Sequence, residues 1–163
     1  MSAIICRVVP GVFAMLMAFT AAASAIDIRP FDAGSMAELR AQYAGRPFVL
    51  AFWSTTCEPC RREMSLWRAL KLRHPAVPVV LVAADPPGDG AAVRAFLLRF
   101  DPGPVEHRMF ADPFAERVRY AVDKRWRGEL PRTYFFDAAH VAEARSGLIE
   151  RRWAEQWFRR HAP

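Results

Sequence analysis

Cysteine and histidine are scarce in this 163-residue chain, which contains only three cysteines and four histidines. A structural zinc site needs four such ligands at characteristic spacings. After Cys6, the only cysteines are Cys57 and Cys60, and the histidines are scattered without ligand spacing. A covalently attached c-type haem needs a histidine directly after the second cysteine, where this chain has Arg61. The composition therefore predicts neither a metal site nor a cofactor.

The chain also lacks a long hydrophobic run. Residues 8–23 are apolar, but a membrane-spanning helix needs about 20 such residues. One charge, Arg7, precedes this run and the small residues 23–25 end it, which is the pattern of a secretory signal peptide. We therefore predict that residues 1–25 are a signal peptide, with a retained N-terminal anchor as the alternative. Residues 26–163 are then expected to form one domain.

The two cysteines that remain after export cannot build a framework of disulfides. Cys57 and Cys60 are separated by two residues, and a disulfide that closes so short a loop removes little entropy from the unfolded chain. An exported protein with this single pair uses its thiols for chemistry. The net charge of +6 at pH 7 is modest. We interpret it as a solvated arginine-rich surface, with acidic partners or an anionic membrane surface as the alternative. No nucleic acid partner is expected.

The two cysteines stand between a predicted strand and a predicted helix. Residues 47–53 form a short, continuous apolar run, which is typical of a buried strand. Apolar residues then recur at helical spacing at Cys60, Met64, Trp67 and Leu70. Both thiols therefore lie at a helix N-terminus, where unpaired backbone N–H groups and the helix dipole lower the pKa of a thiol. Residues three apart are also close enough for a disulfide, so the sequence predicts a redox-active dithiol.

Two segments resemble the thioredoxin-like, membrane-anchored or periplasmic reductases typified by TlpA, ResA and CcmG. Residues 52–63, FWSTTCEPCRRE, are similar to the F-W-x-x-W-C-x-P-C-x-x-E-x-P motif of that family. Residues 128–137, GELPRTYFFD, are similar to its G-x-x-P-x-T-x-x-x-D motif, whose proline is cis. Because the two motifs occur in the same order and at the same spacing as in the family, the resemblance covers most of residues 28–160.

Position along the helix predicts different roles for the two thiols. Cys57, at the exposed start, is expected to attack a partner disulfide, and Cys60, one turn in, to resolve the mixed disulfide. The resemblance implies that Glu63 assists proton transfer, and an ordinary helix-surface residue is the alternative. Carboxylates at Glu58 and Glu63 disfavour a thiolate, which stabilises the disulfide and favours a reductase.

The resemblance also implies a docking loop for the partner. Its cis-proline, Pro131, packs against the disulfide, and Leu130 offers its backbone for strand-like pairing. A turn proline at the start of a strand is the alternative. The remaining residues predicted to bind the substrate are the neighbours of the disulfide, Trp53, Glu58 and Pro59.

Two positions depart from the family pattern, and a third separates the chain from cytoplasmic thioredoxins. Thr56 replaces the tryptophan that precedes the first cysteine, which removes an aromatic cover and is expected to change the choice of partner. Ser65 replaces a proline that kinks the helix. Ala51 stands where cytoplasmic thioredoxins keep a buried aspartate, which argues against a general thioredoxin.

The remaining pattern predicts an α/β, thioredoxin-like fold. Apolar runs at 47–53 and 78–84 alternate with helical patterns, which indicates a central mixed sheet flanked by helices on both faces. Residues 35–38, Ser-Met-Ala-Glu, have the capping-box pattern of a helix start. The resemblance implies an inserted helix and strand near residues 86–110.

These observations predict a thiol-disulfide oxidoreductase that is periplasmic or otherwise exported, and held at the inner membrane if the N-terminus is retained. We expect a monomer that reduces disulfides of envelope proteins, in cytochrome c maturation or oxidase assembly. A membrane thiol-disulfide protein is expected to supply its electrons. A disulfide oxidase or isomerase of the same fold and a non-enzymatic, thiol-based metal-delivery or binding module are the alternatives.

Overall fold

The sheet is built around a strand that has neighbours on both sides. In the computed structural model, which describes residues 26–162, β2 (Phe48–Trp53) is buried along its whole length. It pairs in parallel with β3 (Val79–Ala83) and antiparallel with β5 (Arg132–Phe136). Because helices also cover both faces, no side of β2 meets water and its sequence is continuously apolar rather than alternating. The buried strand predicted at 47–53 is confirmed.

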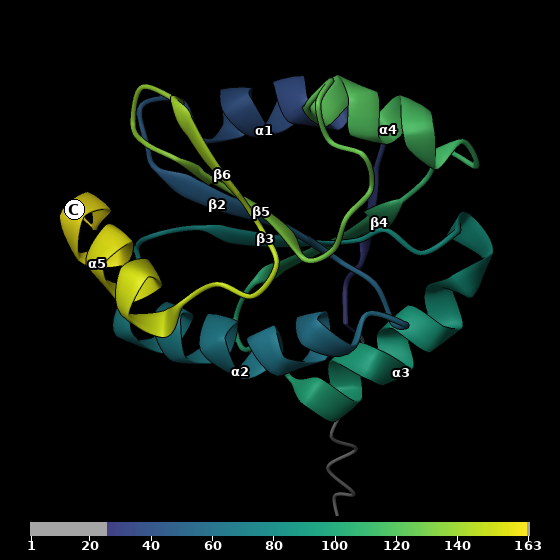
Figure 1. Ribbon diagram of the computed structural model, residues 1–163, viewed down its shortest axis with the longest axis horizontal. Coiled ribbons are helices and arrows are strands. Elements are labelled where there is room, and N and C mark those ends of the chain that lie inside the picture. Colours follow the sequence, from purple (N-terminus) through teal and green to yellow (C-terminus); the bar gives the residue numbers. More distant parts are fainter. Residues whose placement is uncertain (1–25, 163) are drawn as a thin grey trace, which may run out of the picture.

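The strands form one mixed sheet in the order β1-β4-β3-β2-β5-β6 (Figure 1). The strands not yet described are β1 (Arg29–Phe31), β4 (Glu106–Phe110) and β6 (Ala142–Ser146). β1, β4, β3 and β2 run parallel, whereas β5 and β6 form an antiparallel hairpin. The helix and strand predicted near residues 86–110 are present. They are α3 (Gly90–Phe100), which follows a 3-10 turn at Pro87–Asp89, and β4, which lies between β1 and β3.

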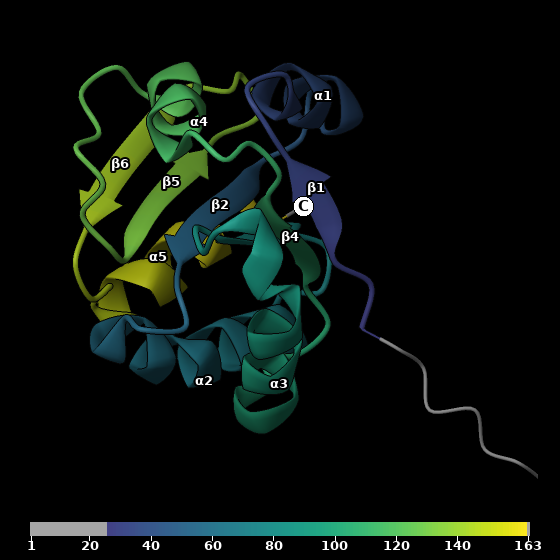
Figure 2. The same cartoon turned by 90° about the vertical axis from the view of Figure 1, so that its right-hand side faces the viewer.

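Helices cover both faces of the sheet (Figures 1 and 2). One face carries α1 (Ser35–Gln42) and α4 (Ala115–Val122), and the other carries α2 (Glu58–Arg73), α3 and α5 (Arg151–His161). Each face has its own hydrophobic core, and β2 contributes alternate side chains to the two. Val49, Ala51 and Trp53 enter the core on the α2 side, and Phe48, Leu50 and Phe52 enter the core on the α1 side. The predicted central mixed sheet flanked by helices is confirmed.

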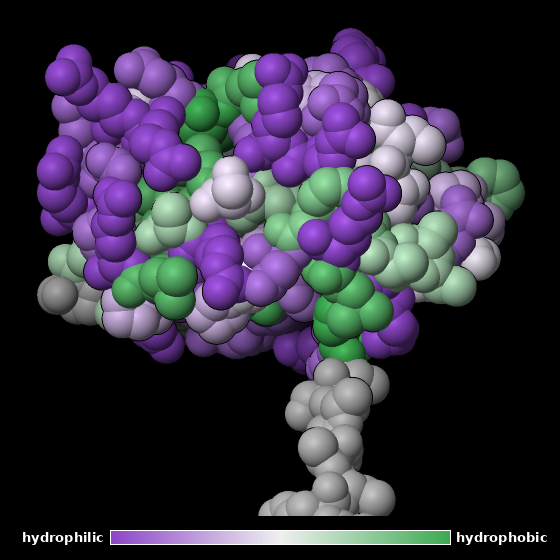
Figure 3. Space-filling model, turned by 90° about the horizontal axis from the view of Figure 1, so that it is seen from below, coloured by the Kyte–Doolittle hydropathy of each residue, from purple (hydrophilic) through white to green (hydrophobic). Residues whose placement is uncertain are grey.

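The surface on the side of α2 and α3 is mixed. Hydrophilic side chains surround smaller hydrophobic areas when the molecule is seen from this side (Figure 3). No helix within residues 26–162 is both long and apolar enough to cross a bilayer. The predicted signal peptide, residues 1–25, lies outside the described residues.

The start of α1 differs from the predicted capping box. Gly34 is the N-cap, and no side chain caps the helix. The Ser35 hydroxyl instead donates to Asp32 Oδ1 at 3.1 Å and accepts from the Asp32 backbone N–H at 2.9 Å. Glu38 accepts hydrogen bonds from Arg108. The capping-box prediction is wrong because Asp32 and Arg108 provide charged partners, which form stronger hydrogen bonds than the backbone does.

A buried arginine joins β4 to α1. The Arg108 side chain is inaccessible to solvent, and its guanidinium donates to both oxygens of Glu38 at 3.1 Å and to Glu106 at 2.6 Å. The hydrogen bonds from Arg108 lower the pKa of Glu38. Burial would raise the pKa of Glu106, but hydrogen bonds from Arg108 and Tyr43 outweigh it and the pKa is lowered. The network therefore stabilises the fold above the ordinary glutamate pKa of 4.5, and this contribution is lost as the pH falls below it.

We expect Arg108→Met to lower the free energy of unfolding by about 3 kcal/mol at neutral pH, because it leaves the buried side of Glu106 without its ion-pair partner. Arg29→Met, which removes an exposed ion pair with the same carboxylate, should cost less than about 1 kcal/mol. Urea denaturation at neutral pH and near pH 3 measures both. The Arg108→Met deficit should shrink in acid, where both glutamates are protonated. Equal losses for the two variants would contradict the importance of burial.

Candidate active site

The two cysteines of the first motif form a disulfide at the start of α2, with their Cα atoms 5.2 Å apart. Cys57 is the N-cap residue and is half-buried, whereas Cys60 lies one turn in and is fully buried. The Cys60 backbone N–H donates to Cys57 Sγ at 3.2 Å, so a donor that the helix itself cannot pair is directed at that sulfur. Cys57 is therefore the sulfur that a partner can reach, as its position along the helix predicts.

The turn that leads into the disulfide is anchored by a carboxylate that sequence analysis missed. Asp85 lies two residues after the end of β3 and is only 5% exposed. Its oxygens accept from the Thr55 backbone N–H at 3.1 and 3.2 Å, and one of them also accepts from the Thr55 hydroxyl. Because Thr55 lies two residues before Cys57, Asp85 fixes the turn between β2 and α2. In the sequence it stands in a proline- and glycine-rich turn, where an aspartate is usually solvated.

Glu63 is buried inside the protein. Its residue is 3% exposed, and its Oε1 accepts from the Ile149 backbone N–H at 2.7 Å, which ties α2 to the segment before α5. Burial raises the pKa of Glu63 to about 7, although the hydrogen bond from Ile149 favours the charged form. The alternative of a helix-surface residue is therefore wrong. A carboxyl that titrates near neutrality, one turn from Cys60, is suited to exchange a proton at physiological pH.

The second motif meets the first at one end of the sheet. The Leu130–Pro131 peptide bond is cis, as the resemblance implies. The antiparallel register pairs Phe52 with Arg132, so Pro131 lies at the end of the sheet where β2 turns toward Cys57. Leu130 is half-buried and packs against both hydrophobic cores. The fold therefore brings together two motifs that are far apart in the sequence.

The residue after the cis-proline organises the loop before it. The Arg132 guanidinium donates to Asp123 Oδ2 at 2.9 Å, to Glu129 Oε1 at 3.3 Å and to Ser146 Oγ at 2.7 Å. Its side chain is 12% exposed. Asp123 follows α4 and Glu129 lies two residues before Pro131, so one guanidinium holds both ends of this loop. Sequence analysis did not single out Arg132, because nothing in the sequence distinguishes it from the other arginines.

The predicted binding residues around the disulfide lie at different depths. Glu58 is exposed and ion-paired with Arg61, and Pro59 is half-buried. Trp53 is 3% exposed, and its ring packs on Phe96 of α3 with the ring centroids 4.6 Å apart. This position gives Trp53 a packing role beneath the turn. Partner binding by Trp53, Glu58 and Pro59 stays a prediction.

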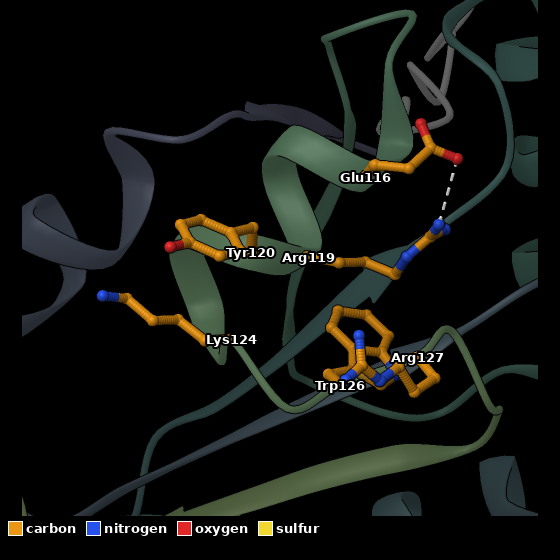
Figure 4. A pocket seen from close by; sticks show the side chains of 6 residues that line it. All are labelled: Glu116, Arg119, Tyr120, Lys124, Trp126 and Arg127. Atoms are coloured by element: carbon orange, nitrogen blue, oxygen red, sulfur yellow. Dashed lines mark hydrogen bonds and ion pairs between the residues drawn. The ribbon is translucent and has the colours of Figure 1, made fainter.

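A hollow of about 280 Å³ lies beside the loop that precedes the cis-proline (Figure 4). It is lined from α4 and this loop by Glu116, Arg119, Tyr120, Lys124, Trp126 and Arg127. Arg119 extends toward Glu116, with which it forms an ion pair at 3.1 Å. Neither cysteine lines this hollow.

We expect Glu63→Gln to stabilise the oxidised protein at alkaline pH. The unfolded chain ionises this carboxyl near its ordinary pKa of 4.5 and the folded protein only near 7, so the stability of the natural protein falls as the pH rises through that window. The penalty approaches roughly 3 kcal/mol above the window. The neutral amide avoids this penalty and still accepts the hydrogen bond from Ile149.

Denaturation of the oxidised protein near pH 4 and near pH 8 measures this effect, and Glu58→Gln is the control because Glu58 is exposed. Glu63→Gln should gain stability mainly at the higher pH. A gain of the same size at both pH values would contradict a buried acid with a raised pKa.

No protein-family model matches the chain, and a search of curated proteins found no match. Solved structures do match. A secreted Mycobacterium tuberculosis disulfide oxidoreductase homologous to E. coli DsbE has 18% identity and a TM-score of 0.59, over 74% of this chain and 85% of that one. A thioredoxin-family thiol:disulfide interchange protein from Chlorobium tepidum has 17% identity and a TM-score of 0.61, over 76% and 85% of the two chains. StoA from Bacillus subtilis has 16% identity and a TM-score of 0.52, over 70% and 83%. At these identities the similarity concerns the fold, and this chain has the thioredoxin-like fold of thiol-disulfide oxidoreductases, as predicted.

Proposed function

We propose that this protein is an exported thiol-disulfide oxidoreductase that reduces disulfides in cell-envelope proteins. One observation carries the proposal. The Cys57–Cys60 disulfide begins α2 at the end of the sheet that also holds the cis Leu130–Pro131 bond. Disulfide exchange with a protein needs a sulfur that the partner can reach and a backbone segment beside it on which the partner docks. The half-buried Cys57 supports the first requirement, and the position of the cis Leu130–Pro131 bond supports the second.

The exchange proceeds in two steps. In the reduced protein the Cys57 thiolate attacks one sulfur of the partner disulfide, a bond forms between the two proteins, and the other partner sulfur leaves as a thiolate and takes a proton. The Cys60 thiol then loses its proton to Glu63 and its sulfur attacks Cys57 Sγ. This step forms the Cys57–Cys60 disulfide and breaks the bond to the partner, whose second sulfur leaves as a thiolate and takes a proton, so that the partner is released as a dithiol. Two electrons pass to the partner, and a membrane dithiol protein returns them to the oxidised pair.

The environment of Glu63 supports the reductase direction. A carboxyl buried one turn from Cys60 disfavours a second negative charge on sulfur, which stabilises the disulfide relative to the dithiol. Glu58 contributes less, because it is exposed and ion-paired with Arg61. The N–H of Cys60 acts in the opposite direction, since its hydrogen bond to Cys57 Sγ favours a thiolate. The buried carboxyl carries more weight, because electrostatic effects are larger away from water.

The pattern of residues 1–25 supports export, and so does the similarity to a disulfide oxidoreductase from Mycobacterium tuberculosis that is described as secreted. We propose a periplasmic or otherwise exported location. The proposed substrates are protein disulfides formed during cytochrome c maturation or oxidase assembly. The proposed reaction requires no cofactor, because the two sulfurs carry the electrons.

We expect Cys60→Ser to accumulate partner proteins as mixed disulfides in the cell envelope, because the thiol that would release them is missing. Cys57→Ser is the matched control and should capture few, since Cys60 is fully buried. Extraction of the envelope with thiols blocked, followed by non-reducing gels and identification of the captured chains, measures both. Captured cytochrome or oxidase-assembly proteins would support the proposed substrates, whereas a broad set of secreted proteins would favour the oxidase. Capture of nothing by a folded and exported Cys60→Ser would contradict exchange with proteins.

The reduction potential of the pair tests the direction of electron flow. We expect a value near or below that of thioredoxin, about −270 mV. Glu63→Gln should make the potential less negative, because the amide no longer opposes a thiolate, whereas Glu58→Gln should change it less. Equilibration with a thiol-disulfide buffer of known potential measures all three proteins. A value of about −120 mV would instead assign the protein as an oxidase.

A further inference from the structure

A hollow lies directly against the disulfide, at the position where this chain departs from the family pattern. Thr56 stands where the family carries a tryptophan, and it is exposed. Together with Cys57 it lines a hollow of about 290 Å³ that reaches across to α3. Phe96 and Phe100 of α3 form the apolar side of this hollow. A partner whose sulfur approaches Cys57 therefore meets the hollow with the residues next to its cysteine.

Two guanidinium groups from different helices line the same hollow. Arg61 of α2 and Arg99 of α3 both lie over the ring of Phe100, with their Cζ atoms 5.7 and 5.2 Å from its centroid. One carboxylate, Glu58, also lines the hollow and is ion-paired with Arg61. Within residues 26–162, no acidic side chain forms an ion pair with Arg99. The side chains around the hollow therefore carry an excess of positive charge next to Cys57.

We propose that this hollow binds an acidic side chain of the partner, an aspartate or glutamate close in sequence to the cysteine that Cys57 attacks. The inference rests on the proposed function and narrows its substrate class. Stacking on Phe100 orients the guanidinium of Arg99, and a planar guanidinium pairs with a carboxylate through two parallel hydrogen bonds. A lysine or arginine at the same place in the partner would be repelled. Thr56 is small enough to leave the hollow open.

The test compares two synthetic peptide disulfides that differ only beside the reactive cysteine, one with glutamate and one with glutamine. The reduced protein should react about three- to tenfold faster with the glutamate peptide at low salt, and high salt should weaken the preference. Arg99→Gln should lower the preference about two- to fivefold. Thr56→Trp, which places a large ring at the hollow, should also lower it. Stopped-flow kinetics of peptide reduction give each rate.

The matched control is Arg62→Gln. Arg62 is the residue directly after Arg61 on α2, so this variant also removes one positive charge, but Arg62 does not line the hollow. It should keep the preference for glutamate. An equal loss in Arg62→Gln and Arg99→Gln would overturn the hollow as the binding site. Equal rates for both peptides with the natural protein would overturn the inference but leave the proposed function intact. Failure to reduce either peptide or any protein disulfide would instead overturn the proposed function.

Discussion

The geometry of the disulfide depends on the burial of β2. This strand is paired on both sides and covered on both faces, so neither its register nor its end can shift without exposing one of the two cores. The turn that follows it is fixed by Asp85, which follows the neighbouring strand and bonds Thr55. Cys57 therefore emerges at a defined place. The antiparallel pairing with β5 brings Pro131 to the same end of the sheet, and Arg132 holds the loop before it.

The inner face of α2 combines packing with chemistry. Cys60, Met64 and Trp67 are buried at helical spacing against the sheet, and Glu63 is buried beside them. An acid in this position reduces stability at neutral pH, because its ionised form is poorly solvated. The same desolvation moves its pKa to about 7, into the range where it can exchange protons with a thiol. On the proposed function, the burial of Glu63 lowers the stability of the protein and at the same time makes the Cys60 thiol more reactive.

Sequence alone predicted β2 and α2, because a strand buried on both faces requires a continuous apolar run and a helix buried on one side requires apolar residues at helical spacing. It also predicted the inserted helix and strand and the cis-proline, through the resemblance. It did not predict Asp85 or Arg132, whose roles depend on partners brought close by folding. The capping box predicted at 35–38 is absent for the same reason, since Glu38 accepts hydrogen bonds from Arg108 and not from the backbone at the helix start. Glu63 could be placed on the helix, but its burial depends on the chain around Ile149.

The surroundings of the disulfide differ on its two sides. α2 lies between α5 and α3, and Glu63 is bonded to the segment that leads into α5, whereas Arg99 comes from α3 (Figure 1). On the proposed function, proton exchange belongs to the α5 side and contact with the partner to the α3 side. Because Arg99 is exposed on α3, whereas Cys60 and Glu63 are buried, a substitution at Arg99 does not disturb the packing around either of them. Substrate preference can therefore change among proteins of this fold while the chemistry of the dithiol is kept.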